Sequence, residues 1–177
     1  MNEFLKKIKL IDNFTTTLQL SKQDFVHRLA QITEKGSASA FSDPFEAFSS
    51  SKSEFKGEVN PNGFKLRRRR KFFERNSNIA IATGNFKEEN GQLTIQTEIY
   101  GFSNFMYFFY GFLIVFYTVF LVGFVFFGST VPIFVVPFLI FHAALMTLLP
   151  YFFMRNSVKK MKYELEREFF YLTKTNS

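Results

Sequence analysis

The densest group of chemically capable side chains in this sequence is a run of cations. Guanidinium and ammonium groups at such density bind phosphates, either those of lipid headgroups or those of nucleic acid. We expect lipid, at about 1 kcal/mol for each basic residue near an anionic surface, because two membrane segments follow in the chain. The seven cations lie within 11 residues and are Lys65, Arg67, Arg68, Arg69, Arg70, Lys71 and Arg75.

Two other interpretations of this run stay open. The first is a solvated strand whose cations pair with nearby acids, for which Glu54, Glu58 and Glu74 are the candidates. The second is a nucleic-acid site, which would have to coexist with a membrane tether and lacks any RRM, KH or helix-turn-helix signature. We therefore do not expect nucleic acid as a partner.

A histidine, His142, lies at the midpoint of the second predicted membrane span. An ionisable residue at such depth is a candidate functional group, and its neighbours with hydrogen-bonding capacity include Tyr117 and Thr147. A proton or ion pathway normally includes a carboxylate, and there is none between Ile99 and Met154. We expect a neutral histidine that is hydrogen-bonded across two helices. The alternative is a pathway through oligomerised hairpins with His142 facing inward.

Enzyme chemistry finds no support in the sequence. It contains no HExxH, G-x-S-x-G, Walker A or G-x-G-x-x-G motif, and Cys is absent. Its two histidines, His27 and His142, are predicted to be solvated and intramembrane respectively, so they do not form a triad or a metal site. We expect no enzyme activity, no metal and no cofactor.

A stretch of 56 residues, Ile99 to Met154, contains no Asp, Glu, Lys or Arg. A helix needs about 20 apolar residues to cross a bilayer, and this stretch accommodates two such helices. We place them at Phe105–Phe127 and Val131–Phe153, with the turn at Gly128-Ser129-Thr130. Residues 101–154 are therefore predicted to form a transmembrane helical hairpin.

Basic residues flank the hairpin on one side. The predicted turn has none, whereas Arg155, Lys159, Lys160 and Lys162 follow the second span at once. Because basic residues stay in the cytoplasm and a hairpin returns both ends to one side, both termini are expected to be cytoplasmic. The first residues lack the apolar stretch of a signal peptide.

The residues before the hairpin indicate a small α+β domain over 1–100 with an antiparallel sheet of about five strands. Ser21 resembles the N-cap of a short helix that ends near Thr33, and 35–53 are expected to form a mobile loop. If the strand that contains Phe64 continues, Arg68 shares its face and cannot be buried there without an anionic partner. The predicted strands cover residues 8–20, 55–59, 64–66, 79–86 and 93–100.

Two β-hairpins are expected among these strands, with turns at Pro61-Asn62-Gly63 and at Glu88-Glu89-Asn90-Gly91. Along 93–100, Gln96 and Glu98 are predicted to point to the face opposite Leu93 and Ile95, as in a half-buried antiparallel strand.

The C-terminal segment, 155–177, is predicted to be an amphipathic helix. Its apolar residues recur at helical spacing, which favours packing on its own sheet or on the membrane face over a coiled-coil contact with a partner. These residues are Val158, Met161, Leu165, Phe169 and Leu172.

The order Phe55-x-Gly57-x-Val59, Phe64-x-Leu66-x-Arg68, Gly84-x-Phe86 and then a hairpin resembles a loose group of small uncharacterised bacterial membrane proteins. In that group a β-rich soluble part precedes two spans, and the likeness covers about residues 50–155. The resemblance implies this fold and the bacterial inner membrane, but no activity. The expected function is that of an accessory subunit or scaffold of a membrane complex, whose partners are anionic lipid and another membrane protein or further copies of the chain.

Overall fold

The computed structural model describes residues 2–38, 53–69, 79–127, 132 and 134–174. They form two compact units. The sheet unit comprises the described residues of 1–102 and 154–177, and the hairpin unit comprises those of 103–153. The fold is α+β, as predicted, but the C-terminal segment belongs with the sheet rather than forming a third part.

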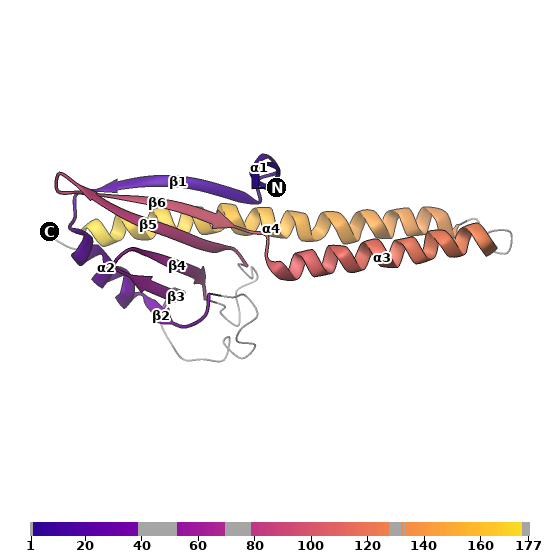
Figure 1. Ribbon diagram of the computed structural model, residues 1–177, viewed down its shortest axis with the longest axis horizontal. Coiled ribbons are helices and arrows are strands. Elements are labelled where there is room, and N and C mark those ends of the chain that lie inside the picture. Colours follow the sequence, from indigo (N-terminus) through magenta and orange to yellow (C-terminus); the bar gives the residue numbers. More distant parts are fainter. Residues whose placement is uncertain (1, 39–52, 70–78, 128–131, 133, 175–177) are drawn as a thin grey trace. The chain divides into compact units, whose positions relative to one another are not determined.

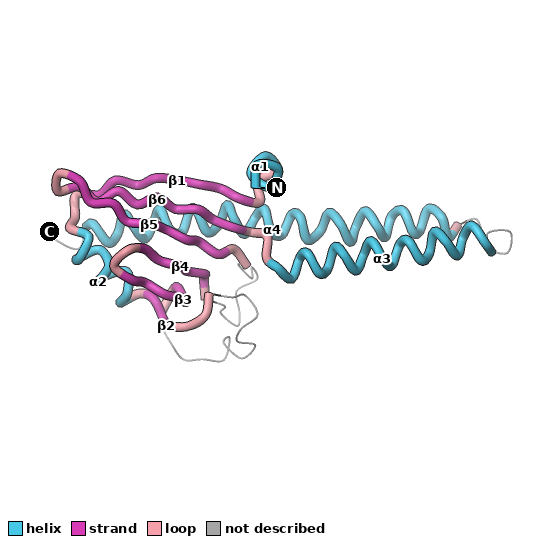
Figure 2. The backbone as a smooth tube through the Cα atoms, in the orientation of Figure 1, coloured by secondary structure: helices cyan, strands magenta, loops and turns pink. Residues whose placement is uncertain are grey.

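The sheet unit contains one six-stranded sheet with the order β1-β6-β5-β4-β3-β2 (Figures 1 and 2). All neighbouring strands are antiparallel except β2 and β3, which pair in parallel. Strand β2 directly follows a helix and is too short for an alternating pattern, so it could not be predicted from its residues. The strands are β1 Ile11–Leu18, β2 Thr33–Lys35, β3 Phe55–Asn60, β4 Gly63–Arg68, β5 Ile81–Glu89 and β6 Gln92–Tyr100.

Both predicted hairpins are present, and their turns have clear chemical causes. Between β3 and β4, the side-chain oxygen of Asn60 accepts hydrogen bonds from the backbone N–H groups of Asn62 and Gly63, at 2.9 and 3.0 Å. Between β5 and β6, Asn90 and Gly91 have φ angles of 52° and 75°, values that Asn and Gly tolerate best. The turns fix the register in which apolar residues of neighbouring strands share one face.

Helices α1 (Asn2–Lys7) and α2 (Lys22–Gln31) flank β1. The N-cap of α2 is Ser21, as predicted, and its hydroxyl accepts the backbone N–H of Asp24 at 3.1 Å. Helix α1 was not expected, because the strand was placed over residues 8–20. The strand begins three residues later than that, after a sharp turn at Lys9.

The core of the sheet unit lies between the sheet and the C-terminal part of α4 (Val135–Lys174). All five residues of the predicted apolar stripe are buried there, so packing of this helix on its own sheet is confirmed. Phe169 lies at the centre, and its ring meets those of Phe25 and Phe64 with centroids 5.3 and 6.0 Å apart. Gly84 is required beneath them, since a Cβ there would be 2.2 Å from the Phe64 ring.

The hairpin unit consists of α3 (Asn104–Phe127) and the first part of α4. Helix α4 is one unbroken helix of 40 residues, whereas two separate helices were predicted. Pro137 lies in its first turn, where a missing N–H removes no intrahelical hydrogen bond. The predicted turn at 128–130 lies outside the described residues.

A buried serine fastens α4 to the beginning of β5. The hydroxyl of Ser157, a residue only 5% exposed, accepts the backbone N–H groups of Ile79 and Ala80 at 2.8 and 2.9 Å. These two hydrogen bonds give an acceptor to backbone N–H groups that would otherwise have none inside the protein.

We predict that Ser157→Ala lowers the free energy of unfolding of the sheet unit by about 1–3 kcal/mol, because it removes the acceptor of two buried N–H groups. The measurement is denaturant unfolding of the full chain in mild detergent, followed by tyrosine fluorescence. Asn156→Ala, at the exposed neighbouring position, is the control and should change stability little. Equal effects of the two substitutions would contradict this role of the hydroxyl.

Candidate functional site

The structure places the first part of the cationic run inside the sheet unit. Lys65 is exposed, whereas Arg67 and Arg69 are only 1% and 3% exposed. Arg68 lies on the face of Phe64 and Leu66, as alternation predicted, and its side chain is 12% exposed. Three further members, Arg70, Lys71 and Arg75, lie outside the described residues.

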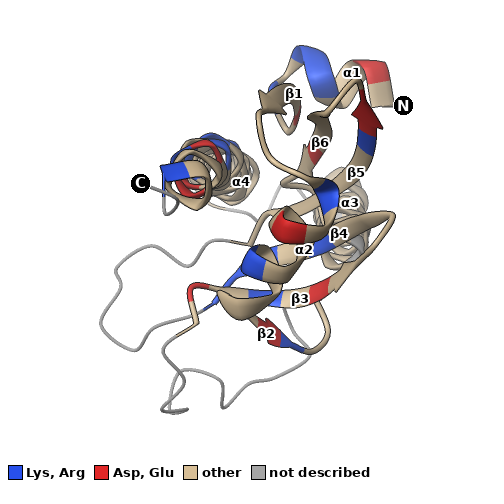
Figure 3. Ribbon diagram, turned by 90° about the vertical axis from the view of Figure 1, so that its left-hand side faces the viewer, with Lys and Arg blue, Asp and Glu red and all other residues tan. Residues whose placement is uncertain are grey.

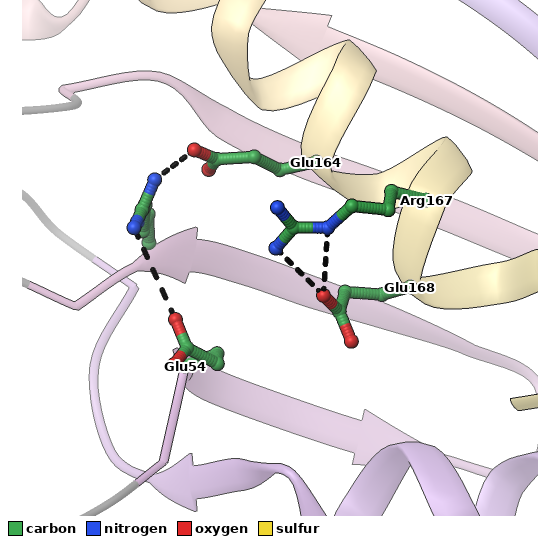
Figure 4. Close-up of polar contacts among 5 residues, drawn as sticks. Glu54, Glu164, Arg167 and Glu168 are labelled. Carbon is green, nitrogen blue, oxygen red and sulfur yellow. Dashed lines mark hydrogen bonds and ion pairs between the residues drawn. The ribbon is translucent and has the colours of Figure 1, made fainter. Parts of the chain in front are cut away.

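Carboxylates from distant segments meet Arg68 and Arg69, and Figure 4 draws the two that Arg68 contacts, Glu54 and Glu164. One guanidinium nitrogen of Arg68 contacts Glu164 of α4, and another lies 4.0 Å from Glu54, just before β3. Arg69 Nε lies 3.1 Å from Glu34 Oε2 of β2. The pairing with Glu54 was one of the alternatives left open by the sequence, whereas the roles of Glu34 and Glu164 were not anticipated.

Arg67 and Arg69 are almost fully buried and the side chain of Arg68 is only 12% exposed, so these three offer a headgroup little surface, which counts against the expected lipid contact for them. The physical reason for this difference is that folding brings acids from elsewhere in the chain to Arg68 and Arg69. The spacing of residues along the sequence does not reveal such contacts. Lipid contact stays a prediction for Lys65 and for Arg70, Lys71 and Arg75.

We predict that Arg68→Met destabilises the sheet unit by about 3–5 kcal/mol, because it leaves the carboxylate of Glu164 buried opposite an apolar side chain. The double variant Arg68→Met/Glu164→Leu should recover most of that loss, since a well-packed apolar pair can replace a buried ion pair. Denaturant unfolding of the full chain in detergent measures both.

The matched control for this cycle is Arg167→Met, which breaks the neighbouring Arg167–Glu168 contact, 2.9 Å long and with an arginine side chain that is 44% exposed. That change should cost at most about 1 kcal/mol. If the double variant Arg68→Met/Glu164→Leu is as unstable as Arg68→Met, the unpaired carboxylate of Glu164 is not the cause of the lost stability.

The opposite face of the sheet is polar where β1, β6 and β5 adjoin. Helix α4 lies on one side of these strands (Figure 3), and the other side forms a hollow of about 370 Å³. Register places the lining side chains in two rows across the three strands. The rows are Asn13, Glu98 and Thr83, followed by Thr15, Gln96 and Asn85.

Amides and hydroxyls dominate this hollow, so it suits hydrogen bonding with a polar surface rather than acid–base chemistry. At its edge the phenol of Tyr100 donates a hydrogen bond to Glu98. That bond, helped by partial burial, raises the pKa of Tyr100 to about 12. The phenol therefore stays protonated at neutral pH, and the stabilisation it gives fades only as the pH rises from about 10 towards 12.

The sequence predicted the orientation of the side chains that β6 contributes to this hollow, but not of those from β1. Alternation along β6 predicted that Gln96 and Glu98 face away from the core, and this is confirmed. The side chains from β1 were missed because Thr15, Thr16 and Thr17 are alike and give no alternating signal. Register with β6, known only from the structure, identifies Thr15 as the one opposite Gln96.

In the hairpin unit, His142 and Tyr117 meet as predicted. The Tyr117 hydroxyl and His142 Nδ1 are 2.7 Å apart, which links α3 to α4. The rings of Phe116 and Phe138 lie 6.5 and 6.1 Å from the imidazole. Thr147 does not join this pair, because its hydroxyl donates to the carbonyl of Ala143 within α4 at 2.8 Å.

The outer surfaces of these two helices are apolar. Ile114, Val125 and Phe141, for example, are 68%, 81% and 65% exposed. A water-soluble protein does not expose so large an apolar area. Both helices are long and apolar enough to cross a membrane.

We predict that His142→Leu weakens the association of α3 and α4 by about 0.6–1.7 kcal/mol, the range found for hydrogen bonds between membrane helices. Thermal unfolding of the full chain in detergent checks this. Tyr117→Phe removes the same bond and is the matched variant, so combining the two should add little further loss. Fully additive losses would show that the two side chains act independently.

A scan against protein-family models, a search of curated proteins and a search of solved structures each find no match to this chain. Among the described residues there is also no group of His, Cys, Asp and Glu that could hold a metal ion.

Proposed function

We propose that this chain is an integral protein of the bacterial inner membrane that works by binding another membrane protein, as an accessory subunit or scaffold. In this proposal both termini are cytoplasmic and the two apolar helices serve as the anchor. The sheet unit presents the binding surface. Two observations support the proposal: basic residues follow the second span, and the chain divides into a hairpin unit and a sheet unit.

The polar hollow over β1, β6 and β5 is the observation that carries the proposal. One face of these strands is closed by α4 with an apolar core, so the fold does not need the other face for its stability. That face nevertheless presents ordered rows of amide and hydroxyl groups, with Thr15, Gln96 and Asn85 exposed. Such groups give a protein partner both donors and acceptors without a buried charge to desolvate.

The alternative is a minimal transporter or channel made of oligomerised hairpins with His142 in its pathway. The Tyr117–His142 hydrogen bond supports an anchoring role instead, because it engages one imidazole nitrogen in joining the two helices. A pathway would also have to work without any Asp, Glu, Lys or Arg between Ile99 and Met154. His142→Leu distinguishes the two: a transporter loses flux, whereas an accessory protein keeps its partner.

We predict that Gln96→Arg, which places a bulky cation in the hollow, lowers recovery of a stoichiometric protein partner at least tenfold. The measurement is a native pull-down of the tagged full chain in mild detergent with quantitative mass spectrometry. Gln23→Arg, at an exposed position of α2, is the control and should retain the partner. Recovery of a homo-oligomer with lipid alone, and no second protein, would contradict the proposed function.

A further inference from the structure

The N-terminal helix α1 is held firmly at one end of the sheet. Lys9, with φ 60°, ends the helix in a Schellman motif. The N–H of Leu10 bonds to the carbonyl of Leu5 at 2.8 Å, and the N–H of Lys9 bonds to that of Lys6 at 3.0 Å. Leu5 and Leu10 are both buried, which supplies the apolar contact that accompanies this motif.

The chain leaves the sheet unit for the hairpin at this same end, and it also returns there from the hairpin. The N–H of Gly101, the residue after β6, donates to the carbonyl of Leu10 at 2.9 Å. A Cβ on Gly101 would lie 2.9 Å from the carbonyl oxygen of Met154, the first residue of α4 in the sheet unit. Helix α3 begins at Asn104, only three residues after Gly101. If the two helices span a bilayer, α1 is therefore tied close to its surface.

The exposed side chains of α1 fit that location. Phe4 is 62% exposed, an unusual position for an aromatic residue on a short helix in water. Lys6, Lys7 and Lys9 are exposed beside it, and Glu3 is the one acid of the helix, 3.7 Å from Lys6. An apolar ring together with a net positive charge is the chemistry of a helix lying in the interface of an anionic membrane.

Helix α4 adds two cations on the same side of the sheet unit. Lys162 lies 3.1 Å from Asp12 of β1, which identifies the side of α4 that faces this strand. Lys159 precedes Lys162 by three residues and Arg155 precedes Lys159 by four, so the three share one helix face. Arg155 and Lys159 are exposed, and neither is paired with a carboxylate of the described residues.

We propose that α1 is an interfacial anchor: Phe4 enters the headgroup layer, and a juxtamembrane basic cluster of Lys6, Lys7, Lys9, Arg155 and Lys159 binds anionic lipid. This inference rests on the proposed insertion of the hairpin in a membrane. It assigns lipid contact to residues other than the buried arginines. The anchor holds the sheet unit at the membrane surface, independently of any protein partner.

The absence of Cys from the chain allows a direct test, because one introduced cysteine carries a unique nitroxide label. The full chain with Phe4→Cys, in which the apolar nitroxide ring takes the place of the phenyl ring, is reconstituted in phosphatidylcholine vesicles with and without phosphatidylglycerol. Relative access to oxygen and to a water-soluble nickel complex reports the depth of the label. Ile114→Cys, in α3, marks the hydrocarbon, and Phe170→Cys, 54% exposed on the sheet unit, is the matched aromatic control.

We expect the label at position 4 to favour oxygen several-fold over nickel in the anionic vesicles, and the label at position 170 to favour nickel. Replacing Lys6, Lys7 and Lys9 by Gln should lower the ratio of docked to undocked α1 by about fivefold for each lysine, whereas replacement by Arg should leave this ratio unchanged. Added salt should act in the same direction as the Gln variant.

Two results would overturn the anchor. One is a label at position 4 that stays aqueous while the label at position 114 is in hydrocarbon, which leaves membrane insertion intact. The other is a docked label that ignores anionic lipid and the three Gln substitutions, which removes the role of the cluster. An aqueous label at position 114 would instead contradict the proposed membrane location itself.

Discussion

The sheet unit depends on the apolar stripe of α4 that closes its core. Val158, Met161, Leu165 and Phe169 are at most 2% exposed, and each apolar side chain of this size contributes about 1.5–3 kcal/mol when buried. A domain of this length has only a marginal core without such a contribution. In the chain, the strands of the sheet precede the hairpin, and the part of α4 that completes their core follows it. The sheet unit therefore cannot be completed until the hairpin has been made.

The same helix explains how several cations can be tolerated next to an apolar core. Arg68 extends from β4 on the core side, and Glu164 occurs one residue before Leu165 in the stripe, so both turn towards the same layer. A guanidinium buried without an acid would be very costly, and the acid would be equally costly without the guanidinium. The pair thus contributes more to the specific seating of α4 on the sheet than to net stability. Apolar packing supplies the free energy, and the ion pair limits the positions that the helix can take.

Much of the fold was predictable because its signals are local. Alternation identified β6, turn residues identified both hairpins, and 3.6-residue spacing identified the stripe of α4. The failures share another cause, which is that they depend on segments far apart in sequence. The cations of β4 look like a surface when read alone, and only the arrival of Glu34 and Glu164 makes them internal. Helix α1 was missed because it has six residues and a single buried one, Leu5, so it shows no helical period of apolar residues.

The candidate sites differ in the same way: those that depend on local signals could be predicted, and those that depend on distant segments could not. His142 and Tyr117 were found from the sequence because few polar groups exist within the spans, which leaves few possible partners. The polar hollow and the basic cluster near α1 each combine strands or helices that are distant in the chain, so composition alone cannot reveal them. They also differ in chemistry: amides, hydroxyls and one carboxylate, Glu98, gather on the sheet face, and exposed cations gather where the chain enters the hairpin. Under the proposed function, this separation would let one small unit bind a protein on one surface and a lipid bilayer on another without competition between the two.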